Sequence, residues 1–237
     1  MSRPAITTLR TVAEGRRAGL TLAWAFNEKT NWVGRALAGR PEPKADEPLR
    51  APRDAAVVSW RANAVRGVLD LEAWAAHPAG EVPEGPWGDA PSEAYGAAMV
   101  FSPPGKEMGG GPDERNPDSI ELEKVAPPDE AAVSEKFFGD LHSLEVKAWG
   151  PNGEKDIFYV AFLGTAPWAE RKGLAGALLR QLFERAKTEG VEVGLITQTE
   201  DNMHYYKKMG FHVVAEDDIM IRTTTGHFYA MSNKKVE

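Results

Sequence analysis

The stretch ERKGLAGALL, Glu170 to Leu179, places two basic residues and a glycine directly before an apolar helical run. The apolar run IFYVAFL at 157–163 precedes it and is typical of a central strand buried on both faces. A chain that enters a helix through RKGLAG brings backbone N–H groups together where the helix dipole favours an anion. A glycine pattern alone is a weak signal, so it fits a phosphate-binding turn and a tightly packed helix start equally well.

The rest of the C-terminal third alternates helical and strand patterns. A helix from Gly173 to about Lys187 carries apolar residues at four-residue intervals, and a strand follows at 191–198. The stretch DNMHYYKKMGF, 201–211, predicts a short helix with an Asp or Asn cap. Two further strands, separated by a turn at TTTG (223–226), complete the series. This order predicts an α/β fold on a mixed sheet.

Proline- and glycine-rich stretches interrupt the first half of the chain. We interpret 77–93 as an enlarged hairpin loop, and 103–130, the least structured composition in the protein, as a surface insertion or mobile flap. We therefore expect a single domain over 1–237, with insertions in 1–150 and a ligand-binding core in 151–237. The elements expected in the first part are strands at 5–10, 69–76 and 94–102 and helices at 11–27, 54–65 and 131–149.

Composition and charge exclude several classes of function. A net charge of -7 argues against general nucleic-acid binding, which needs a surplus of basic residues to neutralise phosphates. The absence of cysteine excludes disulfides, zinc–thiolate sites and cysteine nucleophiles. The five histidines form no ligand-like pair, so we expect no metal site. No apolar run approaches the roughly 20 residues that span a bilayer, and we predict a cytoplasmic protein that does not bind membranes.

Two motifs together resemble the signatures of the GNAT N-acetyltransferase superfamily. The acetyl-CoA signature of that family is Gln or Arg, two residues, Gly, one residue, then Gly or Ala, and ERKGLA at 170–175 resembles it. NMHYYKKMGF at 202–211 is similar to the second signature, and both occur in the family's order and spacing. Glu170 departs from the pattern, so its side chain is not expected to contact phosphate. The tail resembles the branch that includes puromycin N-acetyltransferase and fungal relatives.

The resemblance implies a GNAT fold and an acetyl-CoA site. The fold is a twisted, mixed but mostly antiparallel sheet of about six or seven strands flanked by helices. In this fold the strand before the glycine turn splays from its neighbour and holds acetyl-CoA. By alignment, the residues implied for cofactor binding are Leu163, Gly164 and Thr165 on the strand, Arg171, Lys172, Gly173, Leu174, Ala175 and Gly176 at the turn, and Asn202 and Tyr206 on the last helix.

The resemblance also implies a reaction in which a primary amine attacks acetyl-CoA directly. Tyr206 matches the tyrosine that protonates the departing thiolate. Glu145 is the general base that we name by position, with His142, Glu28 and a water chain as alternatives. We expect an aromatic wall around the acceptor, formed by Trp24, Phe26, Trp32, Phe228 and Tyr229.

Three functions remain open at this level. The first is acetylation of a small amine, by a monomer or homodimer without a metal. The second is acetylation of a protein N-terminus or lysine, and the third is acyl-CoA binding without catalysis.

Overall fold

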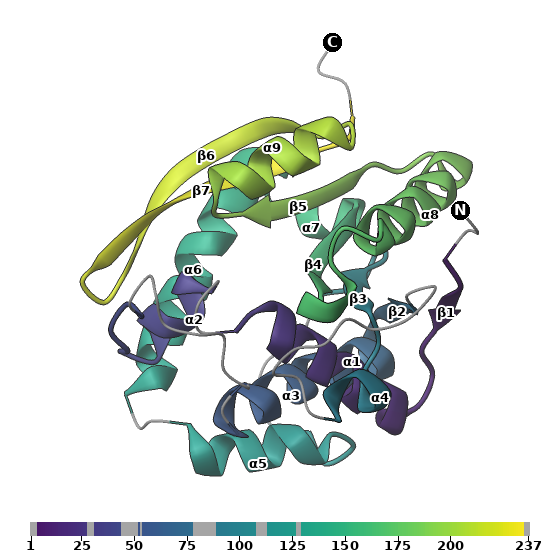
Figure 1. Ribbon diagram of the computed structural model, residues 1–237. Coiled ribbons are helices and arrows are strands. Elements are labelled where there is room, and N and C mark those ends of the chain that lie inside the picture. Colours follow the sequence, from purple (N-terminus) through teal and green to yellow (C-terminus); the bar gives the residue numbers. More distant parts are fainter. Residues whose placement is uncertain are drawn as a thin grey trace.

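The computed structural model describes residues 4–27, 31–43, 52, 54–77, 89–107, 113–126 and 129–234 (Figure 1). Within these residues seven strands form one sheet in the order β1-β2-β3-β4-β5-β7-β6, and every neighbouring pair is antiparallel except β4 and β5. This confirms the predicted α/β fold with a mixed, mostly antiparallel sheet. The strands are β1 (Ile6–Thr8), β2 (Glu72–Ala76), β3 (Ala97–Ser102), β4 (Phe158–Thr165), β5 (Val193–Thr197), β6 (His212–Ile221) and β7 (Thr224–Ser232).

Helices cover both faces of this sheet. They are α1 (Val12–Ala25), α2 (Trp32–Leu37), α3 (Asp54–Asp70), α4 (Ala90–Glu93), α5 (Pro117–Val125), α6 (Glu130–Trp149), α7 (Gly153–Asp156), α8 (Leu174–Glu189) and α9 (Glu200–Lys208), with a short 3-10 helix at Pro167–Ala169.

Apolar clusters divide the covering helices between the two faces. Leu174, Leu178 and Leu182 of α8 and Met203 of α9 pack with Phe158 on one face, as the four-residue spacing in the sequence predicts. On the opposite face α1 and α3 cover the β2–β4 half, and α6 covers the β6–β7 half together with α2. Figure 1 shows α9 and α6 on opposite sides of β6 and β7.

Helix α1 begins where its sequence supplies a capping box. The Thr11 hydroxyl accepts a hydrogen bond from the Glu14 amide at 3.2 Å, and the Glu14 carboxylate accepts one from the Thr11 amide at 2.9 Å. At its centre α1 crosses α3 closely, because a Cβ added at Gly19 would lie 2.4 Å from Cα of Arg61. This crossing fixes the helix layer under β3 and β4.

Strand β4 differs from the prediction of a strand buried on both faces. Val100 pairs with Phe162 and Phe101 with Val160, so Ala161 is an extra residue in a β-bulge. The parallel pairing with β5 extends only from Phe158 to Val160. Several side chains after Val160 are therefore only half-buried, because β4 has lost its neighbour on one side.

The stretch 103–130 is more ordered than its composition predicts, because α5 lies within it. The Asn116 side chain accepts a hydrogen bond from the Ser119 amide and donates one to the Ala62 carbonyl at 2.8 Å. Asp118, at the start of α5, is buried and accepts a 2.7 Å hydrogen bond from Arg16 of α1. These contacts with α1 and α3 stabilise α5, which the local amino-acid composition does not predict. The loop expected at 77–93 lies largely outside the described residues, and α4 occupies its end.

Two local predictions in the last third are wrong. The cap of α9 is Thr199, whose hydroxyl accepts from the Asn202 amide at 3.2 Å, and not an Asp or Asn. The hairpin turn lies at Arg222, before most of the TTTG stretch, which β7 includes. Arg222 has a φ of 54° and its guanidinium donates to the Leu37 carbonyl at 3.1 and 3.0 Å and to Asp129 at 2.6 Å. Contacts with α2 and the start of α6 thus stabilise the turn.

The close crossing of α1 and α3 predicts a difference between two glycine substitutions. Gly19→Ala forces a methyl group into backbone atoms of α3, so we expect it to lower the free energy of unfolding by about 1–3 kcal/mol. Gly139→Ala, on the exposed side of α6 with no atom within 4 Å of the added Cβ, should raise it by about 0.5–1 kcal/mol. Urea unfolding of both variants measures the difference, and equal effects would refute the close crossing.

Candidate active site

The gap between β4 and β5 exposes main-chain groups of β4. The Ala166 amide donates to the Gly96 carbonyl of the β3 side at 2.9 Å, and the register continues with Gly164 opposite Ala98. Because N–H groups alternate in direction along a strand, the Gly164 amide points toward β3. The amides of Leu163 and Thr165 point the other way, toward the side of β4 where β5 no longer pairs with it. Of the three predicted strand residues, two therefore direct donors into the gap.

The turn before α8 places a second set of amides at the mouth of the gap. Gly173 is the N-cap of α8 with a φ of 74°, and no side chain caps the helix. The first intrahelical bond joins the Ala177 amide to the Gly173 carbonyl at 3.0 Å, so the preceding amides of the first turn have no partner within the helix. Uncapped N–H groups at the positive end of a helix dipole form an anion-binding site.

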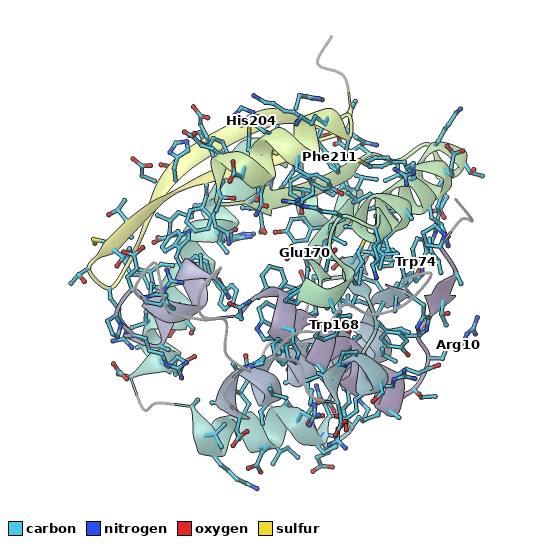
Figure 2. All side chains as sticks on the ribbon, in the orientation of Figure 1. Arg10, Trp74, Trp168, Glu170, His204 and Phe211 are labelled. Carbon is cyan, nitrogen blue, oxygen red and sulfur yellow. The ribbon has the colours of Figure 1, made fainter. Side chains whose placement is uncertain are left out.

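Arg171 adds backbone strain to this turn. Its φ of 59° lies in the left-handed region, which costs a non-glycine residue about 1–2 kcal/mol. Arg171 and Gly173 thus place two left-handed residues within three positions, and a left-handed residue beside a right-handed one is the backbone arrangement of an anion-binding nest. Strain of this kind persists only where the surrounding structure holds the residue in place. Trp168 and Ala169 are fully buried just upstream and hold the turn against the core, whereas Glu170 is exposed (Figure 2).

Two residues that the sequence analysis missed flank the same turn. A Cβ added at Gly176 would lie 3.1 Å from Nη1 of Arg180 and 3.5 Å from the Tyr205 hydroxyl. Both groups therefore approach the first turn of α8, one from the next turn of the same helix and one from α9. Arg180 could be found from its spacing, four residues after Gly176 on the polar side of α8. The position of Tyr205 depends on how α8 and α9 pack.

Tyr206, the predicted acid, lies on α9 with its ring packed against the core. The ring contacts Phe211 and Tyr205 at centroid distances of 5.7 and 5.3 Å. Burial, and to a smaller extent Tyr205, raise the pKa of its hydroxyl well above the usual value. The phenol therefore stays protonated at neutral and mildly alkaline pH, in the form that donates a proton. Asn202 is exposed one turn earlier, and its amide rather than its side chain completes the helix cap.

Glu145, the predicted base, is buried on α6. Its carboxylate accepts a hydrogen bond from the Tyr159 hydroxyl and lies 3.5 Å from Nδ1 of His142. Burial raises its pKa, while Tyr159 and His142 oppose this shift. Because Tyr159 belongs to the paired part of β4, Glu145 lies at the closed end of the gap. Glu28, an alternative base, lies outside the described residues.

The predicted aromatic wall is divided among separate clusters. Trp24 packs edge to face on Trp168, and Phe26 stacks on Trp60, with centroids 5.6 and 4.6 Å apart. Trp32 and Phe228 do meet, at 5.7 Å, under α6. The five aromatic residues, Tyr229 included, therefore do not form one surface.

Clusters of metal ligands and membrane-crossing helices are both absent from the described residues. No group of three or more His, Asp or Glu side chains there could hold a metal ion. No helix in that part of the chain is long and apolar enough to cross a bilayer.

Residues 141–211 match the model of the acetyltransferase (GNAT) family, which spans 71 of the 237 residues. The matched range contains the end of α6, β4, the glycine turn, α8, β5 and α9. It therefore includes the gap, the uncapped helix and Tyr206. No curated protein matches the chain.

Solved structures with a similar fold are distant in sequence. The histone acetyltransferase HPA2 and related acetyltransferase from Corynebacterium glutamicum is 16% identical, with 100% of this chain and 98% of that chain covered and a TM-score of 0.53. Drosophila melanogaster polyamine N-acetyltransferase is 14% identical, covered over 96% and 99% with a TM-score of 0.52. Mosquito arylalkylamine N-acetyltransferase-like 5b is 11% identical, covered over 96% and 99% with a TM-score of 0.53. At these identities the likeness shows the GNAT fold alone.

The two ends of α8 offer a matched test of the anion site. Gly173 and Gly190 both have left-handed backbones, at φ of 74° and 71°, and both have open space around an added Cβ. Alanine at either position should lower the free energy of unfolding by about 1 kcal/mol. Only Gly173→Ala should also weaken acetyl-CoA binding, by about tenfold or more, because it disturbs the amides of the first turn. Calorimetric titration compares the two variants, and equal affinities would show that this turn does not hold the cofactor.

Proposed function

We propose that this protein, which carries a GNAT acetyltransferase domain and is an acetyl-CoA-dependent acyltransferase, transfers the acetyl group directly to a primary amine of a small molecule. The observation that carries the proposal is that the part of β4 without a β5 partner is followed along the chain by the uncapped start of α8. Acetyl-CoA has a thioester on a long arm at one end and a pyrophosphate further along. The β4 amides can bind the arm, and the amides at the start of α8 can bind the pyrophosphate. We further infer that the chain acts as a single cytoplasmic domain.

The main-chain donors take the cofactor. The amides of Leu163 and Thr165 bind the pantetheine arm and the thioester carbonyl, and those from Arg171 to Gly176 bind the pyrophosphate. Arg171 and Lys172 supply positive charge in a protein of net charge -7. A donor fixed at the thioester carbonyl stabilises the negative charge that develops on its oxygen as the amine attacks.

Tyr206 and Glu145, whose pKa values are both raised, take opposite roles. Tyr206 donates its proton to the departing thiolate of CoA, because a phenol is protonated at neutral pH; burial makes it a weaker acid, which the negative charge developing on the sulfur offsets. Glu145 accepts the proton of the attacking amine, since its raised pKa brings a carboxylate closer to the working range of a base. Asn202 hydrogen-bonds the cofactor from the exposed side of α9.

Three features support a small amine as the acceptor: the close packing of α2, the net charge and the sequence resemblance. A Cβ added at Gly226 would lie 2.0 Å from Cζ2 of Trp32, so α2 lies directly on β7. At its other end α2 is bound by the guanidinium of Arg222 through the Leu37 carbonyl. These contacts hold α2 against the hairpin, and a closely packed α2 leaves less room beside the hairpin for a peptide than for a small molecule. The acidic net charge attracts a cationic amine, and the resemblance to the puromycin N-acetyltransferase branch supports the same class.

An assay of CoA release with a panel of acceptors tests this proposal. We expect turnover with one or more small primary amines and none with peptides that present a free N-terminus or lysine. Turnover with peptides alone would reassign the acceptor, and binding of acetyl-CoA without turnover of any amine would leave a non-catalytic binding module.

The same assay separates the two adjacent tyrosines. Tyr206→Phe should lower kcat by about 100-fold or more, because the thiolate then departs without a general acid. Tyr205→Phe should act mainly on the KM for acetyl-CoA, because its hydroxyl lies beside the first turn of α8. Retention of kcat in Tyr206→Phe would exclude Tyr206 as the acid.

A further inference from the structure

A row of residues crosses the sheet at the paired end of β4. The register places Ser102 of β3 opposite Tyr159 of β4, and Tyr159 beside Gly194 of β5. Side chains of directly paired residues project from the same face of a sheet. The row therefore lies on one face, and that face is the one covered by α6, because Trp149 of α6 packs on Tyr159.

Trp149 lies on this row from above. A Cβ added at Gly194 would be 2.8 Å from Cζ2 and 3.1 Å from Cε2 of Trp149, so the indole contacts the strand directly. The indole also meets the Tyr159 ring edge to face, with centroids 5.9 Å apart. The nitrogen of the indole is thereby enclosed between α6 and the sheet.

Glu145 lies one turn before Trp149 on the same helix. It retains only 9% of its surface exposure, yet it faces Tyr159 on the inside and His142 on the outside. The side chain of His142 is 67% exposed. Within the described residues, Tyr159 from β4 and His142 from α6 are the titratable groups that face the carboxyl. Glu145 thus lies between Tyr159, which is on the covered face of the sheet, and His142, which is at the protein surface.

Two buried polar atoms flank the pair of Tyr159 and Glu145. Oγ of Ser102 and Nε1 of Trp149 are shielded from solvent and have no hydrogen-bond partner among the described residues. An unsatisfied buried donor costs about 1–3 kcal/mol, which folded proteins avoid. A buried water commonly makes about three hydrogen bonds to polar groups that would otherwise be unsatisfied. The Ser102 hydroxyl and the Trp149 indole N–H are groups of this kind, one on each side of Tyr159.

We propose that this cluster is a water-binding site, in which bound water hydrogen-bonds Trp149 and Ser102, hydrates the Glu145 carboxyl and links it to His142 at the surface. One part of the inference rests on the proposed function. When Glu145 has taken a proton from the acceptor amine, the proton passes through this water to the imidazole of His142 and then to the solvent. Release of this proton to the solvent restores the Glu145 carboxylate for the next cycle, so the charge of the enzyme is the same before and after turnover.

NMR titration of the Glu145 carboxyl tests the site in the full chain and needs no catalytic activity. Ser102→Ala and Trp149→Phe each remove one donor that reaches the carboxylate through water. Donors favour the charged form, so each variant should raise the pKa of Glu145, by roughly half a unit or more. Ser143→Ala and Trp60→Phe are the matched controls and should not change it, because Ser143 bonds the Gly139 carbonyl and Trp60 stacks on Phe26. Glu145→Gln assigns the resonance.

The outcomes separate the water site from the catalytic proposal. A high-resolution crystal structure should show bound water within hydrogen-bonding distance of Trp149 Nε1 and bound water within hydrogen-bonding distance of Ser102 Oγ. The absence of electron density for water at these two atoms, together with shifts in the Glu145 pKa no larger than those of the control variants, would overturn the proposed water site. If the pKa shifts occur but the pH profile of CoA release does not change in parallel, the water site stands and the assignment of Glu145 as the base is wrong.

Discussion

The rest of the structure depends on the point where β4 stops pairing with β5. Val160 is the last paired residue, and the bulge at Ala161 reverses the direction in which the following amides point. A strand in the middle of a sheet with free N–H groups is costly, at about 1–3 kcal/mol for each donor that finds no partner. A ligand or water must therefore bind those amides. This requirement makes the gap a candidate site for a ligand.

The packing around β4 maintains the gap. On one side α1 approaches so closely that a Cβ added at Gly164 would lie 2.8 Å from Cβ of Ala25. On the other side the buried leucines of α8 pack on Phe158, which fixes the start of α8 beside the open part of the strand. Along the chain, the amides at the open part of β4 come first, and the amides at the start of α8 follow. At the closed end, α6 buries Glu145 against Tyr159 of β4.

Much of this arrangement could be predicted from the sequence. The run at 157–163, the glycine turn and the tyrosine helix predicted β4, α8 and α9 because local patterns determine helix starts and apolar strands. The bulge at Ala161 could not be predicted, because it depends on register with β3, and neither could the distinction between Gly164 and its two neighbours. Helix α5 was missed because its stability depends on contacts of Asn116 and Asp118 with other helices.

The positions of aromatic and polar side chains were the hardest to predict. Trp24, Phe26 and Trp32 are equally apolar in sequence, but the face of the helix or strand decides which cluster each joins. The approach of Tyr205 to Gly176, and of Trp149 to Gly194, depends on interhelical and helix–sheet packing. Such contacts join residues far apart in the chain, and no local pattern reports them.

A crystal structure with CoA bound tests the central claim most directly, that the β4–β5 gap and the start of α8 form one cofactor site. The account predicts main-chain hydrogen bonds from Leu163 and Thr165, but not Gly164, to the pantetheine arm, and the pyrophosphate on the amides of the turn that ends at Gly176. CoA bound elsewhere, or a pantetheine arm that makes no contact with β4 beyond Val160, would contradict it.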